Sequence, residues 1–129
     1  MSEANDLVDR IPDELRPGLA STPVVQFHDA FLHAHCGRFP EARASYAEGK
    51  RLTEELGLRT HKAGSSCFIG LIELFAGDPI AAERVLREGF DELGELGEVG
   101  FRSTVGTLLA EALVDQGRDG EAEEVLKIS

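Results

Sequence analysis

The sequence predicts an all-α fold, an α-solenoid of about three antiparallel helix pairs. Glycine recurs at a spacing of forty residues, and an alanine follows each of these glycines five positions later. Apolar residues between the glycines keep the three-to-four spacing of amphipathic helices, and no β-type alternation extends beyond a few positions. A long internal repeat of helical segments is typical of stacked helix pairs. The matched columns are Gly37, Gly77 and Gly117, and Ala42, Ala82 and Ala122.

The first 21 residues differ from the rest of the chain and predict an N-terminal extension or cap. They contain Pro12 and Pro17, and their apolar residues keep helical spacing only briefly, at Leu7, Val8, Ile11 and Leu15. One or two short helical turns joined to a loop are expected there. The repeat domain is predicted to span residues 22–129.

Each helix of the repeat domain has a start or stop signal. Pro23 follows Ser-Thr and Pro79 follows Asp78, and proline is well tolerated in the first turn after a capping residue. Glycine ends the helices, as at Gly57 and Gly97. The last helix is cut short at Ser129, which predicts a partly uncovered apolar edge. The expected helices are 23–36, 40–56, 60–76, 79–96, 99–116 and one beginning near 120.

Small and large residues alternate in the repeat columns. Small residues at equivalent positions of paired helices allow their backbones to approach closely, and large residues fill the space beside them. The small columns are Ala30, Gly70 and Ala110, and Ala42, Ala82 and Ala122; the large column is Tyr46, Leu86 and Leu126.

These columns resemble the tetratricopeptide repeat. In the middle copy the family pattern falls on Gly70, Gly77, Ala82, Leu86 and Gly89. The period of forty residues is six longer than is usual for that family, and the longer helices absorb the excess. The resemblance implies a non-enzymatic module for protein–protein interaction or regulation, whose first helices line a concave face.

A second resemblance covers roughly residues 60–127. The segments 77–79, 81–84, 108–113 and 116–118 look like the helical-repeat tails of bacterial adenylate/guanylate cyclase-type and ATP-binding transcriptional regulators. In such proteins catalysis takes place in other domains. This resemblance implies an alternative function, a sensing or regulatory segment that binds a small apolar ligand between the first helices.

Transfer of the concave face to this sequence predicts a groove for a partner. Its first two-thirds is apolar and its last third is acidic. The expected occupant is a protein or peptide, either an amphipathic partner helix, the chain's own N-terminal segment or a second copy in a homodimer. The groove positions are Phe27, Phe31, Ala34, His35, Cys67, Leu71, Leu74, Phe75, Thr107, Glu111, Val114 and Asp115.

Charge disfavours nucleic acids and membranes as partners. Acidic residues outnumber basic ones by 24 to 13, and the resulting net charge of −11 repels phosphate groups. The longest mostly apolar run, 67–76, is too short to span a bilayer. Cys36 and Cys67 lack CxxC spacing, and no secretory leader pattern is present, so a cytoplasmic location is expected.

No catalytic, cofactor or metal site is expected. The phosphate-binding GxxxxGK[ST] pattern does not occur, and the segment 64–68 lacks the final glycine of a nucleophile elbow. His28, His33, His35 and Cys36 are the candidate metal ligands. On one helix, however, His28 and His35 lie roughly 10 Å apart along the axis, too far for one ion.

Overall fold

The computed structural model describes residues 22–128, which form helices and turns without any strand. The expected all-α class is confirmed, and the predicted helix ends agree within one or two residues. The expectations for the first 21 residues lie outside the described part of the chain. The helices are α3 (Pro23–His35), α4 (Phe39–Glu55), α5 (Arg59–Gly64), α6 (Ser66–Phe75), α7 (Pro79–Glu95), α8 (Gly100–Asp115) and α9 (Asp119–Ile128).

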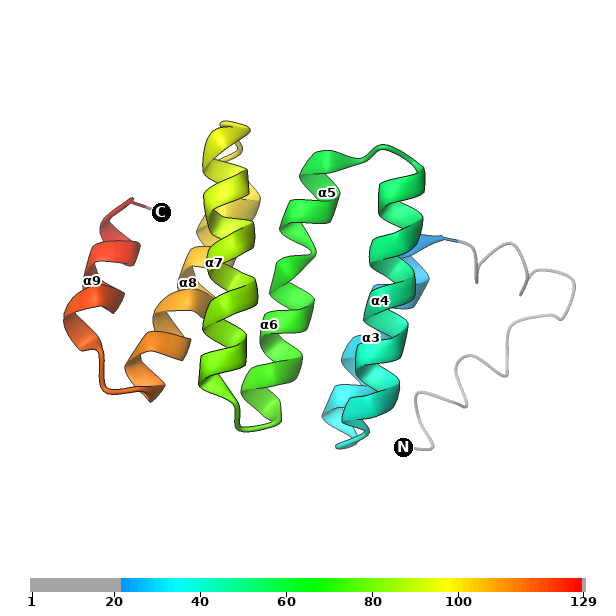
Figure 1. Ribbon diagram of the computed structural model, residues 1–129, viewed down its shortest axis with the longest axis horizontal. Helices are drawn as coiled ribbons and strands as arrows, with labels where there is room; N and C mark the ends of the chain where they lie inside the picture. The colour runs from blue at the N-terminus through cyan, green and yellow to red at the C-terminus, as the bar shows by residue number, and fades with distance from the viewer. Residues whose placement is uncertain (1–21, 129) are drawn as a thin grey trace, which may run out of the picture.

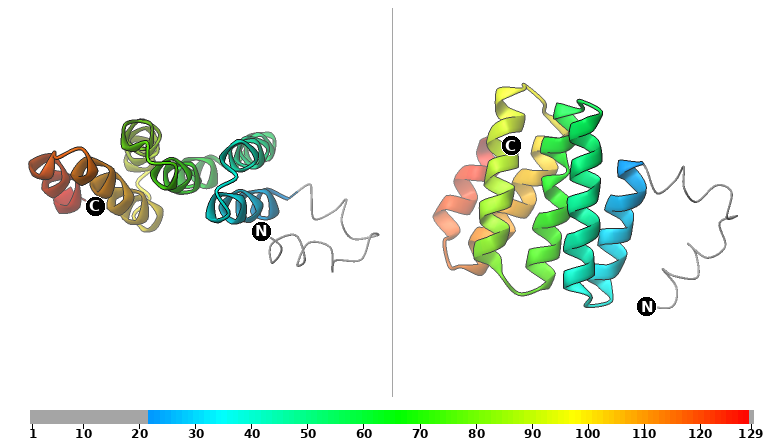
Figure 2. Two further views of the ribbon diagram at one scale, coloured as in Figure 1. Left: turned by 90° about the horizontal axis from the view of Figure 1, so that it is seen from below. Right: turned by 45° about the vertical axis from the view of Figure 1, so that its right-hand side comes forward.

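The helices form three antiparallel pairs in one row (Figure 1). The first arms of the pairs are α3, the bent arm α5/α6, and α8; the second arms are α4, α7 and α9. Viewed along the helices, α4 and α7 lie on one side of the row, α3 and α8 on the other, and α6 between them (Figure 2). The row therefore has a first-arm face, formed by α3, α6 and α8, and a second-arm face, where α4 and α7 flank α5/α6.

A left-handed glycine ends the arm before each turn. At Gly77 (φ 80°) the amide bonds to the Leu74 carbonyl at 3.1 Å, and the next amide bonds to the Glu73 carbonyl at 2.9 Å. This pair of bonds defines the Schellman motif, which satisfies carbonyls at a helix end. The same pair occurs at every positive-φ glycine of the described chain, spaced twenty residues apart: Gly37, Gly57, Gly77, Gly97 and Gly117.

Gly57→Ala should destabilise the fold by about 1 kcal/mol, because alanine is strained at φ 69°. Gly120→Ala is the matched control, since neither position has an atom within 4 Å of an added Cβ and Gly120 lies in helix α9. The control should gain about 0.5 kcal/mol from its reduced backbone entropy. Thermal unfolding of both variants measures the difference; equal midpoints would show that φ at Gly57 is unimportant.

The predicted helix 60–76 is wrong in one respect, because the structure breaks it at Ser65. The Ser65 Oγ donates to the Lys62 carbonyl at 2.6 Å, and the Phe68 amide bonds back to Ser65 at 2.9 Å, a tighter turn than an α-helix. Serine hydroxyls that compete for helix carbonyls bend helices, particularly beside glycine. The helical spacing of apolar residues continues through the break, so the periodicity does not reveal it.

The core follows the repeat columns. Ala42, Ala82 and Ala30 have no exposed surface, and a Cβ added to Gly70 would lie 2.4 Å from a Leu86 methyl carbon. The close approach predicted for these columns is therefore present. The large column differs at its last member: Leu126 is 51% exposed, because among the described helices α9 packs only against α8.

Ala82→Leu should overpack the core and lower stability by about 1–3 kcal/mol. Ala44→Leu is the control, because Ala44 is exposed on α4 and a larger side chain has room there. Chemical denaturation measures both variants. Equal stabilities would mean that the backbones do not meet closely at Ala82.

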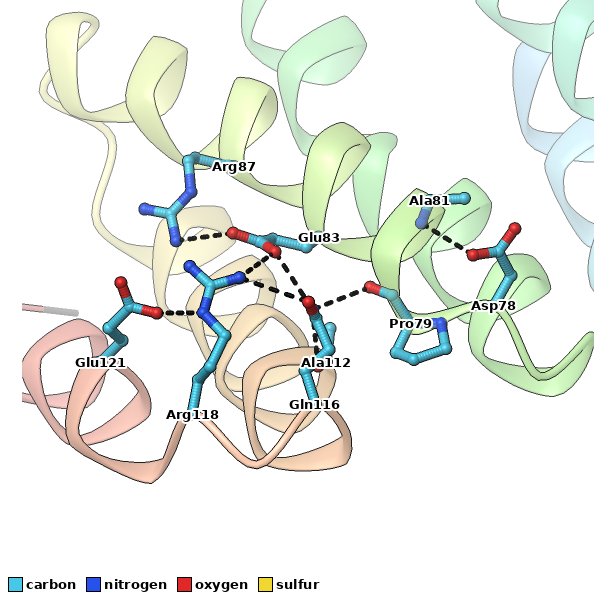
Figure 3. A network of polar contacts seen from close by, with 9 residues as sticks. All are labelled: Asp78, Pro79, Ala81, Glu83, Arg87, Ala112, Gln116, Arg118 and Glu121. Atoms are coloured by element: carbon cyan, nitrogen blue, oxygen red, sulfur yellow. Dashed lines mark hydrogen bonds and ion pairs between the residues drawn. The ribbon is translucent and has the colours of Figure 1, made fainter.

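Polar contacts connect each second arm to the next repeat. Arg43 on α4 donates two hydrogen bonds to the carboxylate of Glu73 on α6, at 2.9 and 2.8 Å. At the equivalent position of the next repeat, Glu83 on α7 accepts bonds from Gln116 at 3.0 Å and Arg118 at 2.6 Å (Figure 3). The position keeps its function of joining neighbouring repeats, although the sign of its charge is reversed.

Protonation of Glu83 should weaken this junction. Burial raises the pKa of the Glu83 carboxyl, but its hydrogen bonds from Gln116 and from the guanidinium groups of Arg118 and Arg87 outweigh burial and hold the pKa below the usual value. A carboxyl with a lowered folded-state pKa stabilises the fold above its unfolded-state pKa. That stabilisation is lost as the pH falls through the folded-state pKa.

Glu83→Gln should therefore cost about 1 kcal/mol at pH 7 and less at pH 3. Glu123→Gln is the control, since Glu123 occupies the equivalent position on α9 and is exposed. Urea denaturation at the two pH values checks the prediction. If Glu83→Gln loses the same free energy of unfolding at both pH values, then the shape of the Glu83 side chain, and not its charge, stabilises the junction.

Candidate interaction surface

Three aromatic side chains meet on the first-arm face. Phe31 and His35 lie one turn apart on α3, and Phe75 is the last residue of α6, which packs against α3. The ring centroids of Phe31 and His35 are 4.4 Å apart, and those of His35 and Phe75 are 5.1 Å apart. The structure thus brings together three residues that the sequence placed in the groove; we call them the aromatic cluster.

An open apolar hollow adjoins the aromatic cluster. It has a volume of about 360 Å³ and lies where the α3–α4 turn meets the end of α6. Phe75, at 44% exposure, is an exposed part of its wall, together with His35 and Gly37. The groove predicted from the sequence did not include Phe39. Its position two residues after the turn glycine Gly37 could have indicated that it lies beside this turn. The lining residues are Ala34, His35, Gly37, Phe39 and Phe75.

Phe27 is core rather than surface. Its side chain is 6% exposed, and its ring stacks on Phe68 with centroids 5.1 Å apart. A Cβ added to Gly49 would come within 2.7 Å of the Phe27 ring, so α3 and α4 enclose the ring tightly. A partner could reach Phe27 only by separating this helix pair, and Phe27 is therefore left out of the surface described below.

The remaining apolar groove positions on α6 are partly buried. Cys67 and Leu74 pack against the larger core cluster, and Leu71 is half-buried. Burial raises the pKa of the Cys67 thiol to about 11, so the thiol is protonated at neutral pH. These three residues are partly buried beneath the first-arm face, while Phe75 and His35 are exposed on that face.

The α8 part of the first-arm face is acidic. Glu111 and Asp115 are exposed one turn apart, and neither forms an ion pair with another residue of 22–128. Thr107 and Val114 are also exposed on α8. An apolar hollow on the α3/α6 side and two carboxylates on the α8 side therefore share one face.

In the histidine-rich segment of α3, the contacts of the side chains are structural rather than catalytic. His33 Nε2 lies 3.4 Å from Asp29 Oδ2, as its spacing of one turn predicts, and the Ser45 hydroxyl donates to the same oxygen at 2.5 Å. Because the carboxylate lies between the hydroxyl and the imidazole, this is not a nucleophile–base pair. Residues 22–128 contain no group of three or more histidine, cysteine or acidic side chains that could hold a metal ion.

The described helices also include none that is long and apolar enough to cross a membrane.

Comparison with known families supports the class of fold. The sequence model of the tetratricopeptide repeat matches residues 23–48 and 105–127. The first segment covers α3 and the start of α4, and the second covers most of α8 and α9, so each match spans one glycine turn. The chain therefore carries tetratricopeptide-like repeats. Such repeats generally mediate protein–protein interaction and are generally non-catalytic.

No curated protein and no solved structure shows a significant match to the chain. The resemblance to the tails of cyclase-type and ATP-binding regulators has no support from these comparisons. That resemblance, and the apolar-ligand sensing it implies, stay predictions.

Proposed function

We propose that this chain is a non-enzymatic interaction module of the cytoplasm that binds a protein segment along its first-arm face. The observation that carries the proposal is the aromatic cluster beside an open apolar hollow. An exposed apolar surface rimmed by polar residues is typical of protein-binding sites. Here the Arg43 guanidinium lies 6.0 Å from the ring centroid of Phe39, which lines the hollow, and Arg43 is paired with Glu73.

The geometry favours an amphipathic partner with two chemical features. An aliphatic or aromatic side chain would fill the hollow against Phe75, and burial of such a side chain stabilises a complex by about 1.5–3 kcal/mol. Lysine or arginine side chains further along the partner would face Glu111 and Asp115. Charge complementarity of this kind fixes orientation and speeds association more than it adds affinity, and salt weakens it.

Selection of peptides from a random display library tests the proposal, with the full chain as bait. Selected peptides should combine an apolar anchor with basic residues. Phe75→Glu should weaken their binding at least about tenfold, because it places a charge in the hollow. Val99→Glu is the control: Val99 is 75% exposed but lies before α8, at the opposite end of the arms.

Other outcomes identify a different occupant or contradict the surface. Self-association that Phe75→Glu abolishes would make a second copy the occupant. Binding that begins only after deletion of residues 1–20 would make the N-terminal segment the occupant. Equal peptide binding by both variants, with helicity retained, would exclude the hollow.

A further inference from the structure

A small crevice with lysine and glutamate side chains among its lining residues lies on the second-arm face, opposite the surface described above. Its walls come from α4 and α5 on one side and α7 on the other, and the start of α6 contributes to its floor. The volume is about 90 Å³, and the crevice is partly open to solvent. A ligand held mainly by its walls would therefore be small.

At the contact between the paired helices, the second repeat lacks a ring that the first repeat has. In the first repeat, the ring of Phe27 packs against Gly49. At the equivalent Gly89, forty residues later, the facing side chain is Ser66, whose Oγ would lie 2.0 Å from an added Cβ. A hydroxymethyl group replaces a phenyl ring at this contact. The break at Ser65 begins α6 at Ser66 and so places this serine against α7.

Within residues 22–128, the hydroxyl of Ser66 has no hydrogen-bond partner. The residue is 6% exposed, and its Oγ lies against Gly89, which lines the crevice. The carbonyl of Lys62, one turn earlier, already accepts the hydroxyl of Ser65. A buried polar group without a partner is unfavourable. Rotation about one side-chain bond would let this hydroxyl donate to an acceptor in the crevice.

Opposite charges line the two walls without pairing across the crevice. Lys50 on α4 and Lys62 on α5 form a cationic wall, and Glu88 and Glu92 on α7 form an anionic wall. Among residues 22–128, the ion pair of Lys62 is with Glu54, at 3.7 Å on its own side. No ion pair within the described chain joins the walls.

We propose that this crevice binds a small zwitterion, an α-amino acid, with its carboxylate toward Lys50, Lys62 and the Ser66 hydroxyl and its ammonium group toward Glu88 and Glu92. A molecule with both charges a few ångströms apart complements both walls, whereas a simple anion or cation complements one wall and is repelled by the other. The volume selects amino acids with small side chains, such as glycine, alanine and serine. The proposal is independent of the partner on the first-arm face.

Bound ligand would join α4 to α7, the second arms of consecutive repeats. It would therefore stabilise the folded chain, by an amount that rises with the logarithm of the ligand concentration over its dissociation constant. It would also limit relative movement of the first two repeats, since Lys50 belongs to the first repeat and Glu88 and Glu92 belong to the second.

Titration of the full chain tests the proposal, with the backbone amide resonance of Gly89 and the thermal midpoint as readouts. Glycine, alanine and serine should shift both, while acetate and methylammonium should be at least about tenfold weaker. Lys62→Met and Glu92→Gln should each weaken alanine binding about tenfold. Lys127→Met and Glu124→Gln, which change the same charges on α9, should leave it unchanged.

Ser66→Ala separates the proposed role of the hydroxyl from simple packing. Removal of an unpartnered hydroxyl should raise the thermal midpoint of the free protein, while the response to alanine falls. Acetate binding as tightly as alanine would overturn the zwitterion proposal in favour of an anion site. Absence of any shift at Gly89, or a response unchanged in Ser66→Ala and Glu92→Gln, would show that the crevice holds only water.

Discussion

The left-handed glycine at each turn is the constraint on which the rest of the structure depends. Because the glycines recur every twenty residues, successive arms reverse direction at a constant interval. The constant interval brings equivalent positions of the arms to the same height, so that small residues meet a buried large residue in the first two repeats. The core columns, the aromatic cluster and the junctions between repeats all follow from this registration. Few residues other than glycine adopt the required φ without strain.

The two faces of the row differ in chemistry because first and second arms carry different residues. The first-arm face combines aromatic rings with the two carboxylates of α8, and the second-arm face holds lysines and glutamates around a small crevice. The hollow and the crevice lie on opposite faces of the row. Partner binding on one side and small-ligand binding on the other can therefore occur without steric conflict.

The sequence was sufficient to predict the arms and their pairing, because glycine stops and apolar spacing are local signals. It also placed Phe31, His35 and Phe75 together, since the repeat alignment carries positions from one arm to the next. The prediction from the sequence failed where the burial of a residue depends on how the helices pack. Transfer of the concave-face positions of tetratricopeptide repeats put Phe27 in the groove, whereas the absence of a side chain at Gly49 lets α4 approach and enclose the ring.

The break at Ser65 and the crevice were also not predictable from periodicity. The break depends on which backbone carbonyl accepts the hydrogen bond of the Ser65 hydroxyl. This hydrogen bond does not change the spacing of apolar residues. The crevice depends on two residues from different repeats, Ser66 and Gly89, whose contact is known only once the arms are packed.

The reversed charges at the repeat junctions make the order of the repeats specific. Arg43 bonds Glu73, and the charge of Asp78 also reaches it; one repeat later, Glu83 bonds Arg118, which is the counterpart of Asp78. If the first repeat were followed directly by the third, Arg43 would face Arg118. If the second were followed by its own duplicate, Glu83 would face a second Glu73. Like charges would therefore oppose exchange of these units between molecules and their duplication within the array.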